Sequence, residues 1–277
     1  MPRNLSAIII VLLITLIIGI SACTSTSPAP NAATQTLQAE RSLKLATSMA
    51  EQLQVTNQVR YAYVTATADA LESSLEVARS WPLVFQDPFE EDRDLWPIGV
   101  EDDELAKISW EIRDGKYIWE ASAYGGFVWW GLPESEIVTD FYLEVEVQII
   151  SGPQDAEAGL VFRSDGEDSY YNLGITNAGS YSLYLHSPAG WEAILDWTAT
   201  SLIKPDQSNK LAVIALGEYF YFFINDSYLT TITDDRLSSG EAGLIIGLSQ
   251  AGEEASWQFD NYLLRSSQGE QVEASAK

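Results

Sequence analysis

Apolar and polar residues alternate in short runs along the chain from residue 82 onward. The clearest run is 141–150, in which Leu, Val and Ile recur at every second position, with Glu144, Glu146 and Gln148 between them. A period of two places the apolar side chains on one face of a strand and the polar side chains on the other. This run therefore predicts a strand with one buried and one polar face.

Further runs rich in β-branched and aromatic residues are separated by turn residues. They predict strands at 108–113, 116–121, 159–163, 170–175, 181–186, 191–197, 210–215, 219–225, 228–233, 243–248 and 256–264. Asp114-Gly115 and Asn225-Asp226-Ser227 are typical of turns between paired strands. Many strands with no helical interval predict an all-β fold of two packed antiparallel sheets over residues 82–268, followed by a flexible tail at 269–277.

The preceding segment, 37–81, has a different pattern. It contains neither Gly nor Pro before Pro82 and is rich in Ala, Leu, Glu and Gln, which favours a single stalk helix. Ala46, Met49 and Leu53 begin an apolar seam, but Thr56 and Arg60 interrupt it. The sequence therefore predicts a helix with an imperfect packing face, and weak self-association through it stays open.

The N-terminus has the features of an export signal. Arg3 precedes an apolar run at 7–18 and small residues at 19–22, just ahead of Cys23. This pattern resembles the lipobox of bacterial lipoproteins. The resemblance implies removal of a signal peptide at 1–22 and attachment of acyl chains such as palmitate to Cys23. A plain transmembrane anchor is the alternative, but a bilayer span needs about 20 apolar residues, more than 7–22 provides.

A Ser/Thr/Pro/Ala-rich segment at 23–36 predicts a disordered tether between the anchor and the helix. The chain has 277 residues and a formal net charge of −25, with 15 Lys and Arg against 40 Asp and Glu. Such an acidic surface repels phosphate backbones, so a nucleic-acid partner is excluded. Cys23 is the only cysteine, so with a lipidated Cys23 no thiol remains for a disulfide or a thiolate metal site.

Several segments carry a family resemblance. These segments are 139–145, 158–163, 169–173, 243–245 and 259–262, and they resemble the concanavalin A-like lectin/glucanase jelly roll in their order. Over 82–266 the chain more closely resembles bacterial extracellular domains grouped near the 3-keto-disaccharide hydrolase type. The resemblance implies a jelly-roll sandwich. It does not fix an activity, because this fold hosts lectins, glycosidases and adhesion modules.

Three sets of residues are candidates for a site. Jelly-roll glucanases place three acids alternately along one strand, and Glu144 and Glu146 resemble two of these, with Gln148 in place of the third. An amide can neither protonate a leaving group nor attack, so this set argues against hydrolysis. The alternative interpretation is the polar face of an ordinary amphipathic strand.

The second set is aromatic: Trp130, Tyr184 and Trp191 are predicted to stack against a sugar ring. Adjacent strand residues point to opposite sides, so one of Trp129 and Trp130 is expected in the core, and the same holds for Tyr170 and Tyr171. Core packing of all these rings is the alternative. His186, the only histidine, is assigned no role.

The third set is Asp87 and Asp260, which would lie near the paired ends of a jelly roll and could hold a structural Ca²⁺. Carboxylates that accept backbone N–H groups explain them equally well. The acidic clusters 90–92 and 101–104 lack the spacing and glycine of an EF-hand loop and are predicted to be solvated loops.

These patterns lead to one main hypothesis: an extracytoplasmic lipoprotein, anchored to a bacterial membrane, whose sandwich binds glycan or cell-envelope material without catalysis. Two alternatives remain open. One is a glycoside hydrolase that uses Glu144 and Glu146. The other is a structural or adhesion module that binds another protein.

Overall fold

The computed structural model describes residues 41, 43–44, 46–47 and 71–267. The chain divides into two compact units, 1–63 and 64–277. In the first unit the described residues are helical, as predicted for the stalk. The signal peptide, the tether and most of the stalk segment lie outside the described residues. Among those described, no helix is both long and apolar enough to cross a bilayer.

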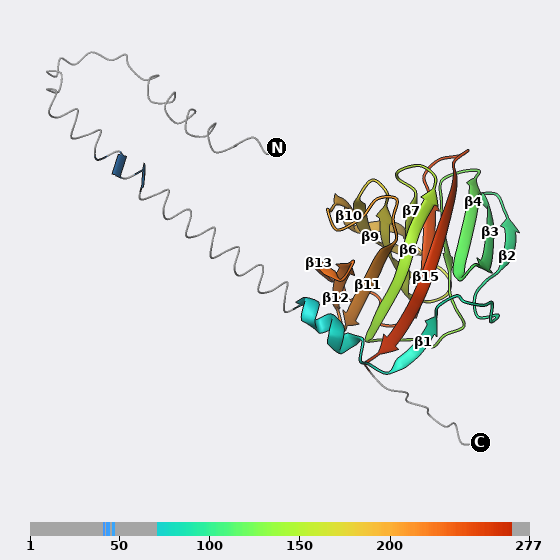
Figure 1. Cartoon of the computed structure of the whole chain (residues 1–277), viewed down its shortest axis with the longest axis horizontal. Coiled ribbons are helices and arrows are strands. Elements are labelled where there is room, and N and C mark those ends of the chain that lie inside the picture. The colour runs from blue at the N-terminus through green and yellow to red at the C-terminus, as the bar shows by residue number, and fades with distance from the viewer. Residues whose placement is uncertain (1–40, 42, 45, 48–70, 268–277) are drawn as a thin grey trace, which may run out of the picture. The chain divides into compact units, whose positions relative to one another are not determined.

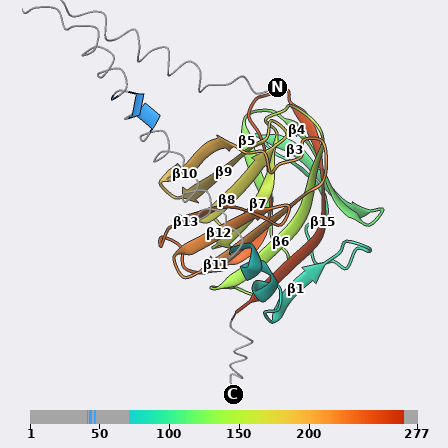
Figure 2. The ribbon, with the colours of Figure 1, turned by 60° about the vertical axis from the view of Figure 1, so that its left-hand side comes forward.

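The second unit is a sandwich of two antiparallel sheets (Figures 1 and 2). The nine-stranded sheet has the order β13-β12-β11-β6-β15-β4-β3-β2, with β1 paired to β15. Its strands are β1 (Leu83–Asp87), β2 (Gly99–Asp102), β3 (Ala106–Arg113), β4 (Lys116–Ala123), β6 (Phe141–Ser151), β11 (Asn209–Leu216), β12 (Tyr219–Ile224), β13 (Ser227–Thr233) and β15 (Glu254–Ser266).

The six-stranded sheet has the order β10-β9-β8-β7-β14-β5. Its strands are β5 (Phe127–Gly131), β7 (Glu157–Ser164), β8 (Tyr170–Thr176), β9 (Ser180–Ser187), β10 (Gly190–Ala199) and β14 (Glu241–Leu248). The predicted two-sheet antiparallel jelly-roll sandwich is confirmed.

The core lies between the two sheets and follows the alternation in the sequence. On β6, Leu143, Val145 and Val147 are almost completely buried, while Glu144 and Glu146 lie on the opposite face. The six-stranded sheet supplies a matching inner face that packs into the same cluster, with residues such as Leu160, Leu173 and Leu244. Burial of these two apolar faces is the main stabilising contribution to the fold.

The two turns singled out in the sequence form as predicted. Asp114 and Gly115 connect β3 to β4 and both have positive φ. Asn225 and Asp226 connect β12 to β13, also with positive φ at both positions. Two-residue turns of this kind match the right-handed twist of the strands that they join.

A helix at 71–78 packs on the outer face of the nine-stranded sheet (Figure 2). Leu75 and Ala78 are buried there in a small cluster of their own, together with Tyr142, Ala212, Ile214 and Phe223. The helix ends a few residues before the predicted boundary at 81, and Arg79 follows it. The end of this helix is therefore part of the folded domain.

The acidic segment 101–104 differs from its prediction as a solvated loop. Residues 101 and 102 are exposed but belong to the edge strand β2, which pairs with β3. Asp103 Oδ1 then accepts backbone N–H groups from Leu105 and Ala106 at 2.7 and 2.9 Å. The segment is polar because its strand lies at an edge of the sheet.

Candidate functional site

A groove of about 690 Å³ lies on the outer face of the six-stranded sheet, the face that points away from the core. It reaches from β5 at one edge of the sheet to β10 at the other. Its ring-bearing lining residues are Phe127, Trp130, Tyr170, His186, Trp191 and Trp197. The groove is therefore framed by aromatic side chains from both edge strands.

The rings form a connected row across the sheet. The centroid of Trp130 lies 4.7 Å from that of Tyr170, and His186 stacks on Tyr170 at 5.2 Å. Trp191 contacts His186 at 4.7 Å and Tyr184 at 6.2 Å. All three residues predicted to stack on a sugar, Trp130, Tyr184 and Trp191, are thus brought together on one face.

The predicted division of adjacent aromatic residues is confirmed at both pairs. Tyr171 packs in the main core, whereas Tyr170 belongs to the outer cluster. Trp129 packs against the core, whereas Trp130 packs against the outer cluster. The alternation of strand side chains places one member of each pair in the groove.

Two rings remain open to a ligand, since Trp191 is 45% exposed and Trp197 is 40% exposed. Others are fixed by hydrogen bonds. Tyr184 donates to Asp196 Oδ1 at 2.8 Å, and burial together with this contact raises the pKa of Tyr184 to about 12. His186 Nδ1 donates to the Asp168 carbonyl at 2.7 Å, which fixes the orientation of its ring.

Glu157, the first residue of β7, lies on the floor of the groove. Its carboxyl group lies over two glycines of the neighbouring strands, because a Cβ built on Gly174 would lie 2.2 Å from its Oε1 and one on Gly247 would lie 3.2 Å from its Oε2. Asn172 Nδ2 donates to Oε1 at 2.8 Å. Burial raises the pKa of Glu157 to about 7, and the hydrogen bond from Asn172 opposes this only in part.

Unsatisfied polar atoms adjoin this carboxyl group. Thr176, which pairs with Glu157 across the ladder and lines the groove, is 3% exposed, and its Oγ1 has no hydrogen-bond partner. Asn172 Oδ1 is also buried without a partner, but Asn172 does not belong to the groove lining. Buried polar atoms normally have partners, so the unpaired Thr176 hydroxyl group in the lining is a place for a ligand to supply one.

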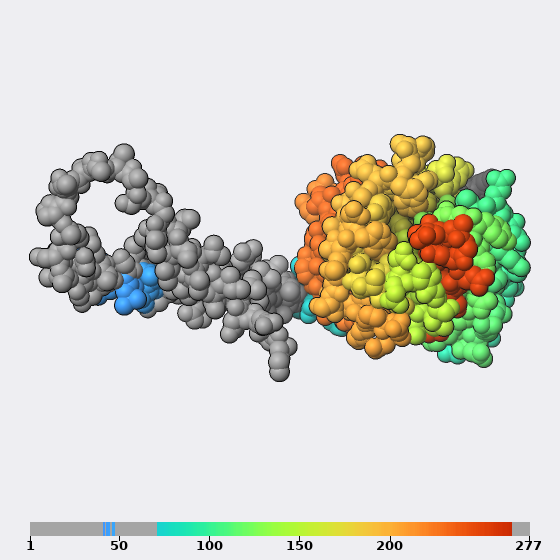
Figure 3. Space-filling view, turned by 90° about the horizontal axis from the view of Figure 1, so that it is seen from above, coloured from blue at the N-terminus to red at the C-terminus, as the bar shows by residue number. Residues whose placement is uncertain are grey.

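The charge of the groove is one-sided. Its lining includes the carboxyl groups of Asp155 and Glu157, but no Lys or Arg side chain lines it in the described part of the chain. Figure 3 views one end of the sandwich, where the β14–β15 turn (orange-red) lies beside the segment that leads into β7 (yellow-green). There Ser249 Oγ donates to Asp155 Oδ2 at 3.1 Å.

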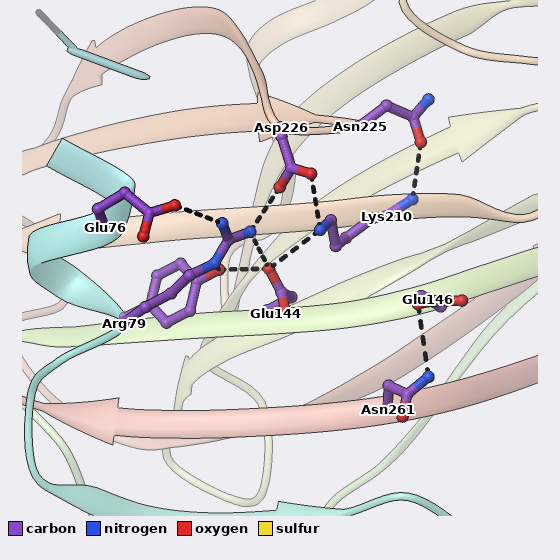
Figure 4. Close-up of polar contacts among 9 residues, drawn as sticks. Glu76, Arg79, Glu144, Glu146, Lys210, Asn225, Asp226 and Asn261 are labelled. Carbon is purple, nitrogen blue, oxygen red and sulfur yellow. Dashed lines mark hydrogen bonds and ion pairs between the residues drawn. The ribbon is translucent and has the colours of Figure 1, made fainter. Parts of the chain in front are cut away.

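Glu144 and Glu146 lie elsewhere, on the outer face of the nine-stranded sheet (Figure 4). Glu144 Oε2 accepts a hydrogen bond from Arg79 at 2.7 Å and another from the Tyr142 hydroxyl. Lys210 lies 4.0 Å from the same oxygen. Glu144 therefore holds the end of the 71–78 helix against the sheet, and the structure does not bring it together with the aromatic groove.

Glu146 is held less tightly than Glu144, by one long hydrogen bond from Asn261 Nδ2 to its Oε1 at 3.4 Å (Figure 4).

The predicted calcium ligands each have a cationic partner. Asp87 Oδ1 accepts the Phe89 N–H at 2.9 Å and lies 3.0 Å from Arg93, and Asp260 binds Lys116. Among the described residues no cluster of three or more His, Cys, Asp or Glu side chains could hold a metal. A structural Ca²⁺ stays a prediction.

The groove residues that the sequence did not point to include Glu157 and the unassigned His186. Glu157 directly precedes the small and apolar residues Ala158, Gly159 and Leu160, which is a weak signal for an acid on a strand. The two glycines over which its carboxyl group lies belong to other strands, so its own segment does not show its place in the groove. His186 carried no signal, because its position depends on contacts with other strands.

No protein-family model matches the chain, and no curated protein matches it. Solved structures do. A GlcNAcα1-4Gal-releasing endo-β-galactosidase from Clostridium perfringens is 11% identical, covers 69% of this chain and 64% of its own, and has a TM-score of 0.51. Two Bacillus subtilis structures follow. A carbohydrate-binding module is 17% identical, and the match covers 66% of this chain and 97% of the module, with a TM-score of 0.46. A protein of unknown function with a galectin-like fold is 15% identical, and the match covers 67% of this chain and 96% of that protein, with a TM-score of 0.49. The likeness to the galactosidase is one of fold, and it agrees with the jelly-roll sandwich that the sequence predicted.

Proposed function

We propose that the groove on the six-stranded sheet binds a glycan without cleaving it. Sugar rings present apolar C–H faces that pack well on aromatic rings, while a few polar groups fix their orientation. The groove offers both kinds of contact, with Trp191 exposed at one edge and Glu157 on the floor. The galactosidase with the same fold acts on a glycan, which is consistent with this proposal.

The observation that carries the proposal is the row of aromatic rings from Trp130 through Tyr170 and His186 to Trp191. Rings that served only the core would point inward, as Tyr171 does. This row instead lies on the outer face of a sheet and ends in a half-exposed indole. In this row Tyr170 is 1% exposed and packs the neighbouring rings, while Trp191 leaves a ring face open for a sugar to stack on.

Binding without catalysis is supported by the placement of the carboxyl groups. Most glycoside hydrolases use two carboxyl groups on either side of the scissile bond. Glu144 and Glu146 lie on the other sheet, and Glu144 is engaged by Arg79. Release of new reducing ends from a bound oligosaccharide would contradict this part of the proposal.

We also propose that a lipid on Cys23 displays the sandwich outside the cell. The residues that support this proposal, 1–23, lie outside the described residues, so the test measures the lipid modification itself. Mass spectrometry of the mature chain should find an N-terminal Cys23 heavier by its acyl chains, and Cys23→Ser should leave the chain in the aqueous phase of a detergent partition. An unmodified thiol on a mature N-terminus, or the same membrane fraction for both chains, would overturn the anchor.

Replacing Trp191 with alanine should weaken glycan binding by about 5- to 150-fold, because loss of a stacking ring costs on the order of 1–3 kcal/mol. The measurement is isothermal titration of the full-length chain with oligosaccharides first selected on a glycan array. Tyr219→Ala is a matched control, since Tyr219 is 44% exposed on β12 of the other sheet.

Tyr219→Ala should bind like the unchanged chain. Equal losses in the two variants would mean that exposed aromatic residues act without regard to the groove. Absence of binding to every glycan on the array would remove the proposal altogether. A protein partner that tolerates both substitutions would favour an adhesion module instead.

A further inference from the structure

We propose that the groove prefers sugars that carry a free amine, and that Glu157 receives the amine as an ammonium ion. This inference rests on the proposed glycan binding and names the class of sugar. Glu157 presents an unpaired carboxyl oxygen in a groove whose described lining contains no lysine or arginine.

The acceptors are specific atoms. Glu157 Oε1 is bound by Asn172 Nδ2, but no hydrogen bond joins Oε2 to another residue within the ranges that the structure describes. Thr176 Oγ1, which belongs to the groove lining, is buried and unpaired. An ammonium group supplies three donors and no acceptor, so one such group can donate to more than one acceptor. A hydroxyl group supplies only one donor.

The charges around Glu157 favour the same ligand. Asp155 lies near Glu157 in the same groove. Strands β8 and β9 contribute Tyr170, Tyr184 and His186, and β14 contributes the backbone of Gly247. No lysine or arginine competes for the carboxylate in the described groove lining. The chain as a whole carries a net charge of −25, which attracts cations to its surface.

The rings add a further preference. A cation close to the face of an indole is attracted by the negative charge of the ring face. Trp130 and Trp191 both contact Tyr170 and both line the groove that holds Glu157, so an amine bound in this groove would meet a carboxylate and aromatic side chains. A uronate, sulfate ester or phosphodiester would instead lie beside Glu157 and Asp155 without a cation to pair with.

The ionisation of Glu157 fits this role. Burial raises its pKa to about 7, so its charge is only partly developed at neutral pH. A bound ammonium ion favours the ionised form and lowers that pKa. The unliganded protein loses stability as the pH rises from the unfolded carboxyl value towards 7, because the folded state binds the proton more tightly. Glu157→Gln removes this cost, so the variant is expected to fold.

The experiment titrates the full-length chain at pH 7 with three β-1,4-linked tetramers, of glucosamine, N-acetylglucosamine and glucose, and with a lysine tetrapeptide. The glucosamine tetramer should bind at least about tenfold more tightly than the glucose tetramer, because hydrogen bonds to charged groups contribute about 1.5–3 kcal/mol. In Glu157→Gln this advantage should fall to twofold or less while the glucose tetramer still binds. Glu146→Gln, which removes the same charge on the other sheet, should keep the full advantage.

The possible outcomes separate the two proposals. If no sugar binds, glycan binding itself fails. If the glucose tetramer binds as tightly as the glucosamine tetramer, only the amine preference is wrong. A preference that survives in Glu157→Gln, or falls equally in Glu146→Gln, would also overturn it. So would a lysine tetrapeptide that binds as tightly as the glucosamine tetramer, since the groove would then recognise a cation rather than an amino sugar.

Discussion

Arg163→Ala should lower the free energy of unfolding by about 4–6 kcal/mol, the largest effect expected of any substitution discussed for this chain. Arg163 is 1% exposed and donates to three backbone carbonyls, Leu237 O at 2.7 Å, Thr139 O at 3.1 Å and Gly217 O at 2.6 Å. Each buried carbonyl left without a donor costs about 1–3 kcal/mol. Its guanidinium also lies 4.8 Å from the centre of the Phe220 ring, a contact that alanine removes.

The measurement is urea unfolding followed by circular dichroism. Arg236→Ala is a matched control, because Arg236 lies in the same region and its side chain is 37% exposed, with Glu192 and the less exposed Asp234 as partners. An exposed ion pair contributes about 0–1 kcal/mol, and Asp234 keeps its hydrogen bond from Tyr171, so the control should lose much less than Arg163→Ala. Arg163→Lys should fall between the two, since one ammonium cannot reach all three carbonyls. Similar losses for Arg163→Ala and Arg236→Ala would refute the structural role of Arg163.

Gly159→Ala should cost about 3 kcal/mol or more. The groove floor brings β7 and β8 so close that a Cβ built on Gly159 would lie 1.9 Å from the Leu173 carbonyl oxygen and 2.9 Å from its carbon. Both are backbone atoms, so the strands must separate to accept a methyl group. Overpacking of this kind costs about 1–3 kcal/mol even where side chains can yield.

Gly125→Ala provides the control, since a Cβ there would meet nothing within 4 Å. It should leave stability within about 0.5 kcal/mol of the unchanged chain. Thermal unfolding of both variants, monitored by tryptophan fluorescence, compares them directly. If the two alanine variants unfold at the same temperature, the close approach of β7 and β8 at the groove floor would be disproved.

The sequence was a good guide to strands and faces. Alternation along 141–150 predicts which side chains of β6 enter the core, and the turn residues predict the hairpins at Asp114 and Asn225. The division of Trp129 from Trp130 follows from the same period of two. These predictions succeed because they depend on local geometry, which neighbouring residues determine.

The site was harder to predict because its parts come together through pairing between distant strands. Alternation shows that Glu144 faces away from the core, but it does not show which sheet holds the residue or what covers that face. The outer face of the nine-stranded sheet is partly covered by the 71–78 helix, whereas the six-stranded sheet carries the groove. Glu157 and His186 acquire their roles from strands β8, β9 and β14, contacts that their own segments do not encode.

The docking of Leu75 and Ala78 also has a mechanical consequence. The chain enters the sandwich on one outer face, while the groove opens on the other. If the groove binds a polymer as proposed, tension between that polymer and the N-terminal segment would act across the two sheets. The packed core between the sheets would then bear the force, instead of the hydrogen bonds of a single edge strand.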